Sequence, residues 1–203
     1  MLTCDNITLY RDGKAIFKNL AFSLLPSCLL HIRGPNGSGK TSLLRLLARL
    51  INDHEGHVRY NGIDVDTASA EYFSFIRYIP SNGLLDMEFR VIDQIKLWAY
   101  LLNSADAMEA AIATLDFDGD ILEQRIFSLS LGYQQRLRLL LLLLSRGAIW
   151  FLDEPFTSLD REVSDILSNM IEARRVNGGI IVYADHRDES LKDEVALVLT
   201  DFA

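Results

Sequence analysis

The sequence contains few cysteines, and this scarcity limits the kinds of protein that it can encode. Cys4 and Cys28 are the two present, and they show neither metal-ligand spacing nor a disulfide framework. A reducing compartment is the simpler interpretation. The stretch from Met1 to Asn6 lacks a basic segment and a long apolar run, so we expect no export signal.

Long hydrophobic runs are lacking as well. The longest, Leu139 to Leu144, consists of six leucines, with Arg136 and Arg138 before it and Arg146 after it. A helix that spans a membrane needs about 20 mostly apolar residues. We therefore predict a buried helix at this run and no segment that crosses a membrane.

The sequence also contains fewer basic than acidic residues. Lysine and arginine total 20 against 28 acidic residues, which gives a net charge of −8. This balance argues against a nucleic-acid-binding face, so we expect no nucleic acid among the partners. The 203 residues, of which 49% are hydrophobic, suit one globular domain with an inserted subdomain.

The most informative segment is a glycine-rich stretch that fits the phosphate-binding pattern G-x-x-x-x-G-K-[ST]. Its glycines let several backbone N–H groups face inward and form a concave anion site. Lys40 can then reach the β- and γ-phosphates of a nucleotide, and the Thr41 hydroxyl can ligate Mg²⁺. A strand-like run at 29–32 and a helical spacing at 41–50 supply the expected context, against the alternative of a turn with a chance lysine. The candidate residues are Gly34, Pro35, Asn36, Gly37, Ser38, Gly39, Lys40 and Thr41.

The hydrophobic pattern of the whole chain predicts an α/β fold. Apolar strands that alternate with helices indicate a parallel sheet covered on both faces. The turn Arg11 to Lys14 predicts a hairpin, and Asn61-Gly62 predicts a tight turn. From about 84 to 127 strand signals fade, so we expect a mostly helical insertion, with Asn103-Ser104 as a cap. Strands are predicted at 2–10, 15–25, 29–33, 56–62, 73–79, 148–152 and 179–183, and helices at 41–50, 91–102, 105–115, 132–145 and 161–175.

Two acids follow the apolar strand at 148–152. Asp153 and Glu154 fall beyond its carboxyl end, which is where open α/β sheets bind their ligands. An acid at a strand tip can hold Mg²⁺, and the next acid can orient and deprotonate an attacking water. The alternative is a solvated acidic turn that leads into Pro155.

These motifs resemble those of ABC-type ATPase subunits over nearly the whole chain. In the order of that family, they are the phosphate loop, the segment Leu129 to Arg136, the strand that ends in Asp153 and Glu154, Ser158-Leu159-Asp160, and His186. The chain resembles most the short export subunits of cytochrome c biogenesis, of the heme exporter A type. The stretch Trp150 to Thr157 and the spacing from Tyr78 to Asp93 favour that branch.

The resemblance implies a P-loop NTPase fold of the RecA-like type, in a single ABC ATPase domain over residues 1–203. Residues 1–80 and 145–203 would form the nucleotide-binding core, with a parallel sheet and an antiparallel β subdomain. Residues 81–144 would form a helical subdomain that carries the signature motif. The cofactors implied are ATP and Mg²⁺.

The resemblance also implies a role for each matched residue. Tyr10 would stack on adenine, the backbone from Asn36 to Thr41 would surround the phosphates, and Ser42 would lie beside them. Lys40 would be catalytic, Glu154 would be the general base, and His186 would contact the γ-phosphate. Asp153 and Thr41 would sit by Mg²⁺. Ser130 and Gly132 would face the γ-phosphate of ATP bound to a second copy, and Asp160 would also contact the nucleotide.

Three features depart from the family pattern. In the signature Leu-Ser-Gly-Gly-Gln, Leu131 replaces the first glycine and Tyr133 the glutamine. The glutamine expected before the insertion is absent; Asn82 aligns best, with Ser81 as a rival, and would reach Mg²⁺ and the nucleotide with a shorter amide. Asp185 stands before His186, where a small hydroxyl residue is common.

The function implied is ATP hydrolysis coupled to transmembrane export, of heme in cytochrome c biogenesis, at the cytoplasmic face of the bacterial inner membrane. The partners would be integral membrane subunits, among them one of the heme exporter B type, and a second ATPase copy. Nothing resembles a heme ligand site, and His31, His54 and His57 are expected to be structural or solvated. An apolar docking patch is a hypothesis for Leu84, Leu85, Met87, Phe89 and Trp98, which could instead pack the insertion's own core.

Two other functions stay open at this point. The chain could be a soluble ABC-type ATPase that drives assembly or remodelling of a protein complex. It could also be an ATP-dependent clamp with weak turnover, which the altered signature segment would permit.

Overall fold

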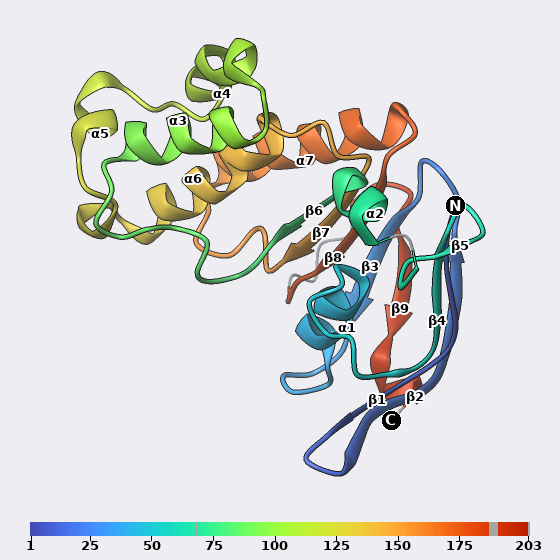
Figure 1. Ribbon diagram of the computed structural model, residues 1–203. Coiled ribbons are helices and arrows are strands. Elements are labelled where there is room, and N and C mark those ends of the chain that lie inside the picture. The colour runs from blue at the N-terminus through green and yellow to red at the C-terminus, as the bar shows by residue number, and fades with distance from the viewer. Residues whose placement is uncertain (68, 187–190, 203) are drawn as a thin grey trace. The chain divides into compact units, whose positions relative to one another are not determined.

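The computed structural model describes residues 1–67, 69–186 and 191–202 (Figure 1). The chain forms two compact units, each built from separate stretches of sequence. The first unit comprises Met1–Tyr78, Gly147–Glu154 and Glu172–Ala203, and the second comprises Ile79–Arg146 and Pro155–Ile171. The division into a nucleotide-binding core and a helical subdomain at 81–144 stays a prediction.

An antiparallel sheet of the first unit has the strand order β2-β1-β4-β5. Its strands are β1 (Leu2–Arg11), β2 (Lys14–Leu24), β4 (Glu55–Tyr60) and β5 (Ile63–Asp64). Arg11 pairs with Lys14 across the turn, which confirms the predicted hairpin. Asn61 and Gly62 have φ angles of 52° and 83°, which a two-residue hairpin turn requires, so the Asn-Gly turn is confirmed too.

A five-stranded sheet has the order β6-β7-β8-β3-β9. Its strands are β3 (Leu29–Arg33), β6 (Ile76–Ile79), β7 (Ile149–Asp153), β8 (Ile180–Ala184) and β9 (Val195–Val198). The pairs β7–β8, β3–β8 and β3–β9 are parallel. Every residue of β7 and β8 is buried, as expected for apolar strands covered on both faces. The predicted parallel sheet is therefore confirmed.

Helix α1 (Lys40–Leu47) connects the two sheets through the core of the first unit (Figure 1). Its buried leucines join one apolar cluster with residues of both sheets, such as Ile7 and Phe17 of the antiparallel sheet and Val182 of β8. The helix is shorter than predicted because Arg49 has a φ of 61°, a left-handed conformation that ends a helix. The core therefore fixes α1 directly behind the loop that precedes it.

The second unit is helical, as predicted. Its elements are α3 (Val91–Leu101), η1 (Ala105–Ala107), α4 (Met108–Thr114), α5 (Gly119–Glu123), η2 (Ile126–Ser128), α6 (Leu131–Leu143) and the first part of α7 (Arg161–Val176). The leucine run lies on α6, where Leu139 to Leu142 are buried, which confirms the buried helix. Among the residues that the structure describes, no helix is long and apolar enough to cross a membrane.

Several predicted boundaries are wrong. Residues 73–75 end a helix, α2 (Ser69–Phe75), instead of beginning a strand. The aromatic residues there favour strands intrinsically, but the helix lets the buried Tyr72 donate a hydrogen bond to the Leu47 carbonyl at 2.9 Å. Ser104 precedes η1 as expected but makes no capping hydrogen bond. The short elements β5, β9 and α5 were not predicted, because their few residues carry little periodicity.

Candidate functional site

A cleft of about 1020 Å³ opens in the first unit. Its walls come from the β1–β2 turn, the glycine-rich loop, the start of α1, the residues after β7 and β8, and η3 (Leu199–Phe202). The predicted site residues that line it are Pro35, Asn36, Gly37, Ser38, Gly39, Lys40, Thr41, Ser42, Glu154 and His186. Residues 151 positions apart in the sequence, Pro35 and His186, thus share one cavity.

The glycine-rich loop presents free backbone groups to this cleft. Helix α1 begins at Lys40 without a side-chain cap, so its first N–H groups have no intrahelical acceptor and attract an anion. Gly39 has a φ of 98°, and a Cβ built on it would lie 2.4 Å from a methyl carbon of Ile16. Only glycine fits there. The buried Ser38 hydroxyl has no hydrogen-bond partner, as expected of a group that awaits a polar ligand.

Lys40 is held at the base of the loop. Its ammonium donates to the carbonyls of Gly34 at 2.8 Å and Pro35 at 3.1 Å, and the residue is only 7% exposed. Burial lowers the pKa of this ammonium below its usual 10.5, although the carboxylates of Glu154 and Asp153 act in the opposite direction. The ammonium has three N–H donors, and a phosphate oxygen in the cleft could accept a hydrogen bond from the third.

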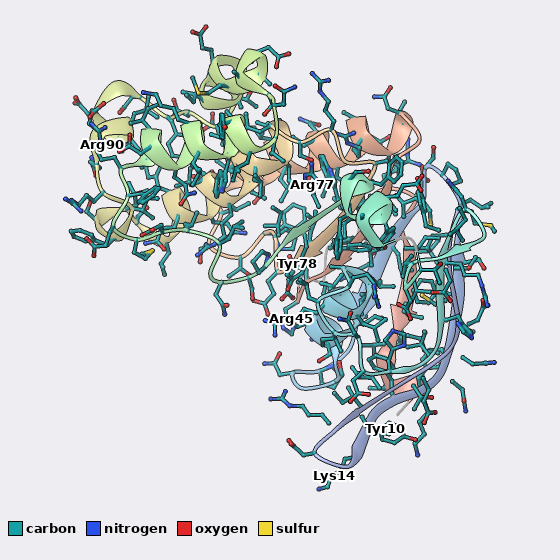
Figure 2. The ribbon with its side chains drawn as sticks, viewed as in Figure 1. Tyr10, Lys14, Arg45, Arg77, Tyr78 and Arg90 are labelled. Atoms are coloured by element: carbon teal, nitrogen blue, oxygen red, sulfur yellow. The ribbon has the colours of Figure 1, made fainter. Side chains whose placement is uncertain are left out.

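Thr41 and Asp153 form the second part of the site. The Thr41 hydroxyl donates to Asp153 Oδ1 at 3.0 Å, which brings the start of α1 to the tip of β7. Tyr78 adds a hydroxyl on this side, with Arg45 Nε 3.4 Å away (Figure 2). Burial and the nearby Asp153 carboxylate raise the pKa of Tyr78. Two hard oxygen ligands side by side suit a cation such as Mg²⁺, which takes few protein ligands and completes its shell with phosphate and water.

Glu154 and His186 form the third part. Glu154 Oε1 lies 3.5 Å from His186 Nε2, and both side chains are partly exposed to the cleft. The Glu154 backbone has a φ of 51°, and its N–H donates to the Ala184 carbonyl at 2.8 Å. Left-handed backbone at a non-glycine residue costs free energy and is frequent at functional sites. A carboxylate in this position can accept a proton from a water molecule in the cleft.

Some cleft residues were missed, and one predicted residue lies apart. Arg11, Lys14 and Thr200 line the cleft, and the two cations in the predicted turn, Arg11 and Lys14, were the signal that could have found part of this wall. Tyr10 is 51% exposed on β1 and is not among the described lining residues. Its role in stacking on a base stays a prediction.

The signature segment belongs to the second unit. Ser130 caps α6 by accepting a hydrogen bond from the Tyr133 N–H at 3.3 Å. A Cβ on Gly132 would lie 3.3 Å from the Ser158 carbonyl, so the glycine allows a close approach. Leu131, in contrast, points into solvent with 69% of its surface exposed. The replacement of glycine by Leu131 therefore does not disturb the packing of the unit. Gly132, where packing requires a small residue, is retained.

Tyr133 and Asp160 have partners within the same unit. The Tyr133 ring lies 5.8 Å from that of Phe117, and the Arg136 guanidinium lies 4.9 Å from its centre. Asp160 caps α7 through the Val163 N–H at 2.9 Å and forms an ion pair with Arg136 at 2.6 Å. These two hydrogen bonds hold the pKa of Asp160 below its usual 3.8.

Asn82 is exposed in the second unit, in the segment that follows β6. Its predicted contact with Mg²⁺ and nucleotide stays a prediction. Of the predicted docking residues, Leu84, Met87 and Phe89 are 37–40% exposed, whereas Trp98 is buried with 6% exposure. The docking interpretation of Trp98 is therefore wrong, because its ring packs within the helices of the insertion.

Comparison with known proteins identifies the family of this chain, and the similar proteins described below belong to the same family. The family model described as ABC transporter matches residues 17–157. A cytochrome c biogenesis ATP-binding export protein, CcmA, of Wolbachia pipientis is 34% identical over 203 residues, which is 100% of this chain and 98% of the relative. The CcmA protein of Nitrosomonas europaea is 32% identical over 192 residues, or 93% of this chain and 89% of that protein.

Solved structures share the fold. The dimeric structure of a post-hydrolysis state of an ATP-binding cassette bound to ADP and Pi has a TM-score of 0.84 at 18% identity, over 98% of this chain and 94% of that one. An ATP-binding subunit of an ABC transporter has a TM-score of 0.79 at 20% identity, over 92% of this chain and 79% of that one. At these identities the likeness supports the fold alone.

Proposed function

Because the chain belongs to the ABC transporter family, and within it to the CcmA family of cytochrome c biogenesis ATP-binding export proteins, we propose that it is the ATP-hydrolysing subunit of a heme exporter. The observation that carries this proposal is the cleft, in which an anion-binding loop, a pair of hard oxygen ligands and a carboxylate beside a histidine meet. Each is a part that phosphoryl transfer to water needs.

The loop and the oxygen pair are suited to ATP and Mg²⁺. Lys40 and the N–H groups at the start of α1 would donate to the β- and γ-phosphate oxygens, with the Ser38 hydroxyl as a further donor. Thr41 and Asp153 would hold Mg²⁺, Thr41 directly and Asp153 directly or through water. When bound, the ion neutralises charge that develops on the phosphate oxygens.

Glu154 and His186 would act on the attacking water. Water oxygen forms a bond to the γ-phosphorus while the bond from that phosphorus to the β–γ bridging oxygen breaks, and Glu154 accepts the proton of the water. His186, 3.5 Å from Glu154, would donate to a γ-phosphate oxygen beside that water. Products are ADP and phosphate.

The signature segment would complete the site of a second copy. Ser130 at the start of α6, Gly132 and the acid Asp160 belong to the second unit and are not among the residues described as lining the cleft of the first. An exposed helix N-terminus suits the γ-phosphate of ATP held by another chain. We infer a dimer with two ATP molecules at its interface, in which Tyr10 stacks on adenine and Asn82 approaches Mg²⁺.

The partners would be integral membrane subunits, one of the heme exporter B type among them. The energy of ATP hydrolysis must reach a membrane to serve export, and no helix of the described residues could span one. The chain would therefore sit peripherally, at the cytoplasmic face of the inner membrane, on those subunits. Co-purification tests this: extraction from membranes without any integral partner would contradict it.

Phosphate release tests the hydrolytic role. In membranes that contain the complex, Glu154→Gln should lower the rate at least about 100-fold, because the amide cannot accept the water proton. The exposed Glu109→Gln, which makes the same chemical change on α4, should leave the rate unchanged.

Equal rates for wild type and Glu154→Gln would remove Glu154 from catalysis. A wild type that binds ATP but releases no phosphate would instead favour the ATP-dependent clamp.

A further inference from the structure

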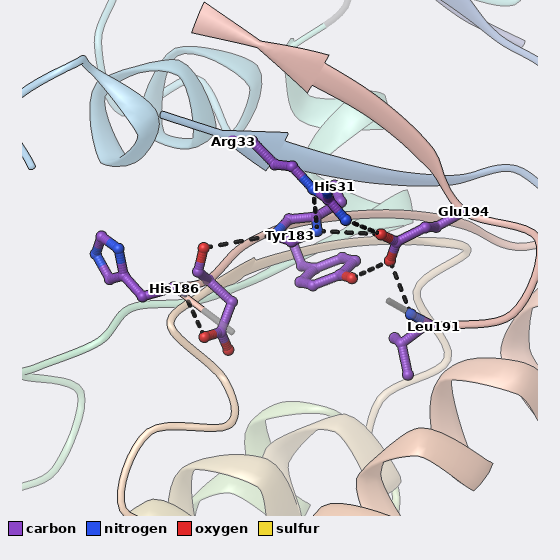
Figure 3. A network of polar contacts seen from close by, with 7 residues as sticks. His31, Arg33, Tyr183, His186, Leu191 and Glu194 are labelled. Carbon is purple, nitrogen blue, oxygen red and sulfur yellow. Dashed lines mark hydrogen bonds and ion pairs between the residues drawn. The ribbon is translucent and has the colours of Figure 1, made fainter. Parts of the chain in front are cut away.

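A buried polar network lies directly behind His186 and takes no part in the chemistry described so far (Figure 3). Its centre is the Glu194 carboxylate, whose side chain is 5% exposed. Arg33 Nη2 donates to Oε1 at 2.7 Å, the Leu191 N–H donates to Oε2 at 3.0 Å, and the Tyr183 hydroxyl also donates to Oε2. A buried carboxylate that accepts hydrogen bonds from this many donors fixes the groups around it.

His31 connects this carboxylate to the backbone before His186. The imidazole is 1% exposed and stacks on the Tyr183 ring, with centroids 4.3 Å apart and planes at 13°. Its Nδ1 lies 3.2 Å from Glu194 Oε1 and accepts a hydrogen bond from Arg33 Nε at 3.1 Å. Its Nε2 lies 3.4 Å from the Asp185 carbonyl, and because a carbonyl oxygen accepts hydrogen bonds, Nε2 is the donor of this contact.

The segment that carries His186 is therefore held from inside. Asp185 is the residue directly before His186, and its side chain accepts a hydrogen bond from the His186 N–H at 2.6 Å. His31 lies on β3, two residues before Arg33 and three before Gly34, where the phosphate loop begins. The network thus joins the base of the phosphate loop to the strand end that presents His186 to Glu154.

We propose that Glu194 and His31 are positioning residues, which hold His186 at the distance from Glu154 that phosphate release requires. This inference rests on the proposed hydrolytic function and goes beyond it, because neither side chain lines the cleft. Glu194 holds the Arg33 guanidinium and the His31 ring in place, and the Nε2–H of His31 holds the Asp185 carbonyl. Without Glu194, the Asp185 carbonyl is no longer held, and the distance between His186 and Glu154 can change.

The test combines kinetics with a double-variant cycle on the full chain with its co-purified membrane subunits. Glu194→Gln should lower kcat by about 10- to 100-fold, because small misplacements of a catalytic group have effects of this size. The Kd of a non-hydrolysable ATP analogue should stay within about threefold, since the loop residues that bind phosphate are unchanged. In the His186→Ala background, Glu194→Gln should cause no further loss.

Variants of His31 and a surface control separate positioning from general damage. His31→Ala should match Glu194→Gln, whereas His31→Gln should recover part of kcat, because its amide can still donate to the Asp185 carbonyl. Glu123→Gln removes a different carboxylate, paired with Arg90 at 2.7 Å on the surface, and should leave kcat unchanged. If Glu194→Gln does not fold, the two His31 variants decide the question alone.

The outcomes distinguish this inference from the function on which it rests. If Glu194→Gln leaves kcat unchanged, or multiplies the loss caused by His186→Ala, the positioning role is wrong while the ATPase stands. If Glu154→Gln and His186→Ala both hydrolyse ATP like wild type, the proposed function is wrong, and the positioning role with it.

Discussion

The cleft of the first unit and the signature segment of the second, Leu129 to Arg136, hold their functional groups in different ways. In the cleft, Thr41 is bonded to Asp153 and Glu154 faces His186. In the signature segment, Leu131 points into solvent. The cleft groups find partners within their own unit, whereas the proposed partner of the signature segment is a second chain.

This difference explains where the sequence departs from its family pattern. A side chain at position 39 would collide with Ile16, so this position of the loop tolerates only glycine. A change at an exposed position such as 131 affects no internal contact, and a tyrosine at 133 packs on Phe117 and Arg136. Internal packing therefore protects the phosphate loop, and only association with another chain constrains the exposed signature positions.

The largest effect should come from a pair of glycine variants in the loop. Gly39→Ala and Gly37→Ala both place a side chain at positive φ, which costs about 1–2 kcal/mol. Only at Gly39 would the new methyl group also meet a neighbour, Ile16, because the space around Gly37 is open. We expect about 2–4 kcal/mol of destabilisation for Gly39→Ala and about half of that for Gly37→Ala.

Chemical denaturation measures both values, and titration with ATP should show the larger loss of affinity for Gly39→Ala. Equal destabilisation by the two variants would show that the approach to Ile16 is not what selects the glycine.

A smaller effect should follow from Leu131→Gly, which restores the family residue in the signature segment. Because the side chain is exposed, the free energy of unfolding should fall by no more than about 1 kcal/mol, the helix-propensity cost of glycine. In the dimer, removal of this bulky side chain beside Ser130 should relieve a steric contact with the second copy. We expect the rate of phosphate release to rise about threefold. A drop in release with unchanged stability would mean that Leu131 itself contacts the second chain productively.

The smallest effect should be the pH dependence contributed by Asp160. Its pKa in the folded chain lies below the ordinary 3.8, so its stabilising contribution is present above that value and is lost as the pH falls below it. Asp160→Asn keeps an N-cap for α7 but loses the charge that faces Arg136. Thermal unfolding should show a Tm lower by roughly 2 °C at pH 6, since a half-exposed pair contributes little, and a smaller difference near pH 3. A difference of the same size at pH 3 would contradict the assignment.

Much of the cleft could be predicted from the sequence because its parts are local patterns. The loop from Gly34 to Thr41 and the acids Asp153 and Glu154 follow strand-length apolar runs, and the rule that ligands bind at strand ends brings them together. The hairpin, the parallel sheet and the leucine-rich helix could likewise be predicted, because local turn residues and the spacing of apolar residues indicate them.

What could not be predicted depends on contacts between distant residues. The aromatic run at 73–75 has strand propensity, yet the bond from Tyr72 to the Leu47 carbonyl belongs to a helix. His31 was expected to be merely structural or solvated, and only the fold brings it to Glu194, 163 positions away. Trp98 was a candidate for docking because apolar side chains in a sequence do not reveal which of them are buried.

The most direct test of the central claim is complementation between two inactive chains. Lys40→Ala removes the cation of the cleft and leaves the signature segment intact, whereas Ser130→Arg blocks the exposed start of α6 and leaves the cleft intact. Each variant alone should release no phosphate. A one-to-one mixture should recover about a quarter of the wild-type rate, because half of random dimers are mixed and each has one intact site of two. A mixture as inactive as its two parents would contradict a site shared between copies of this chain.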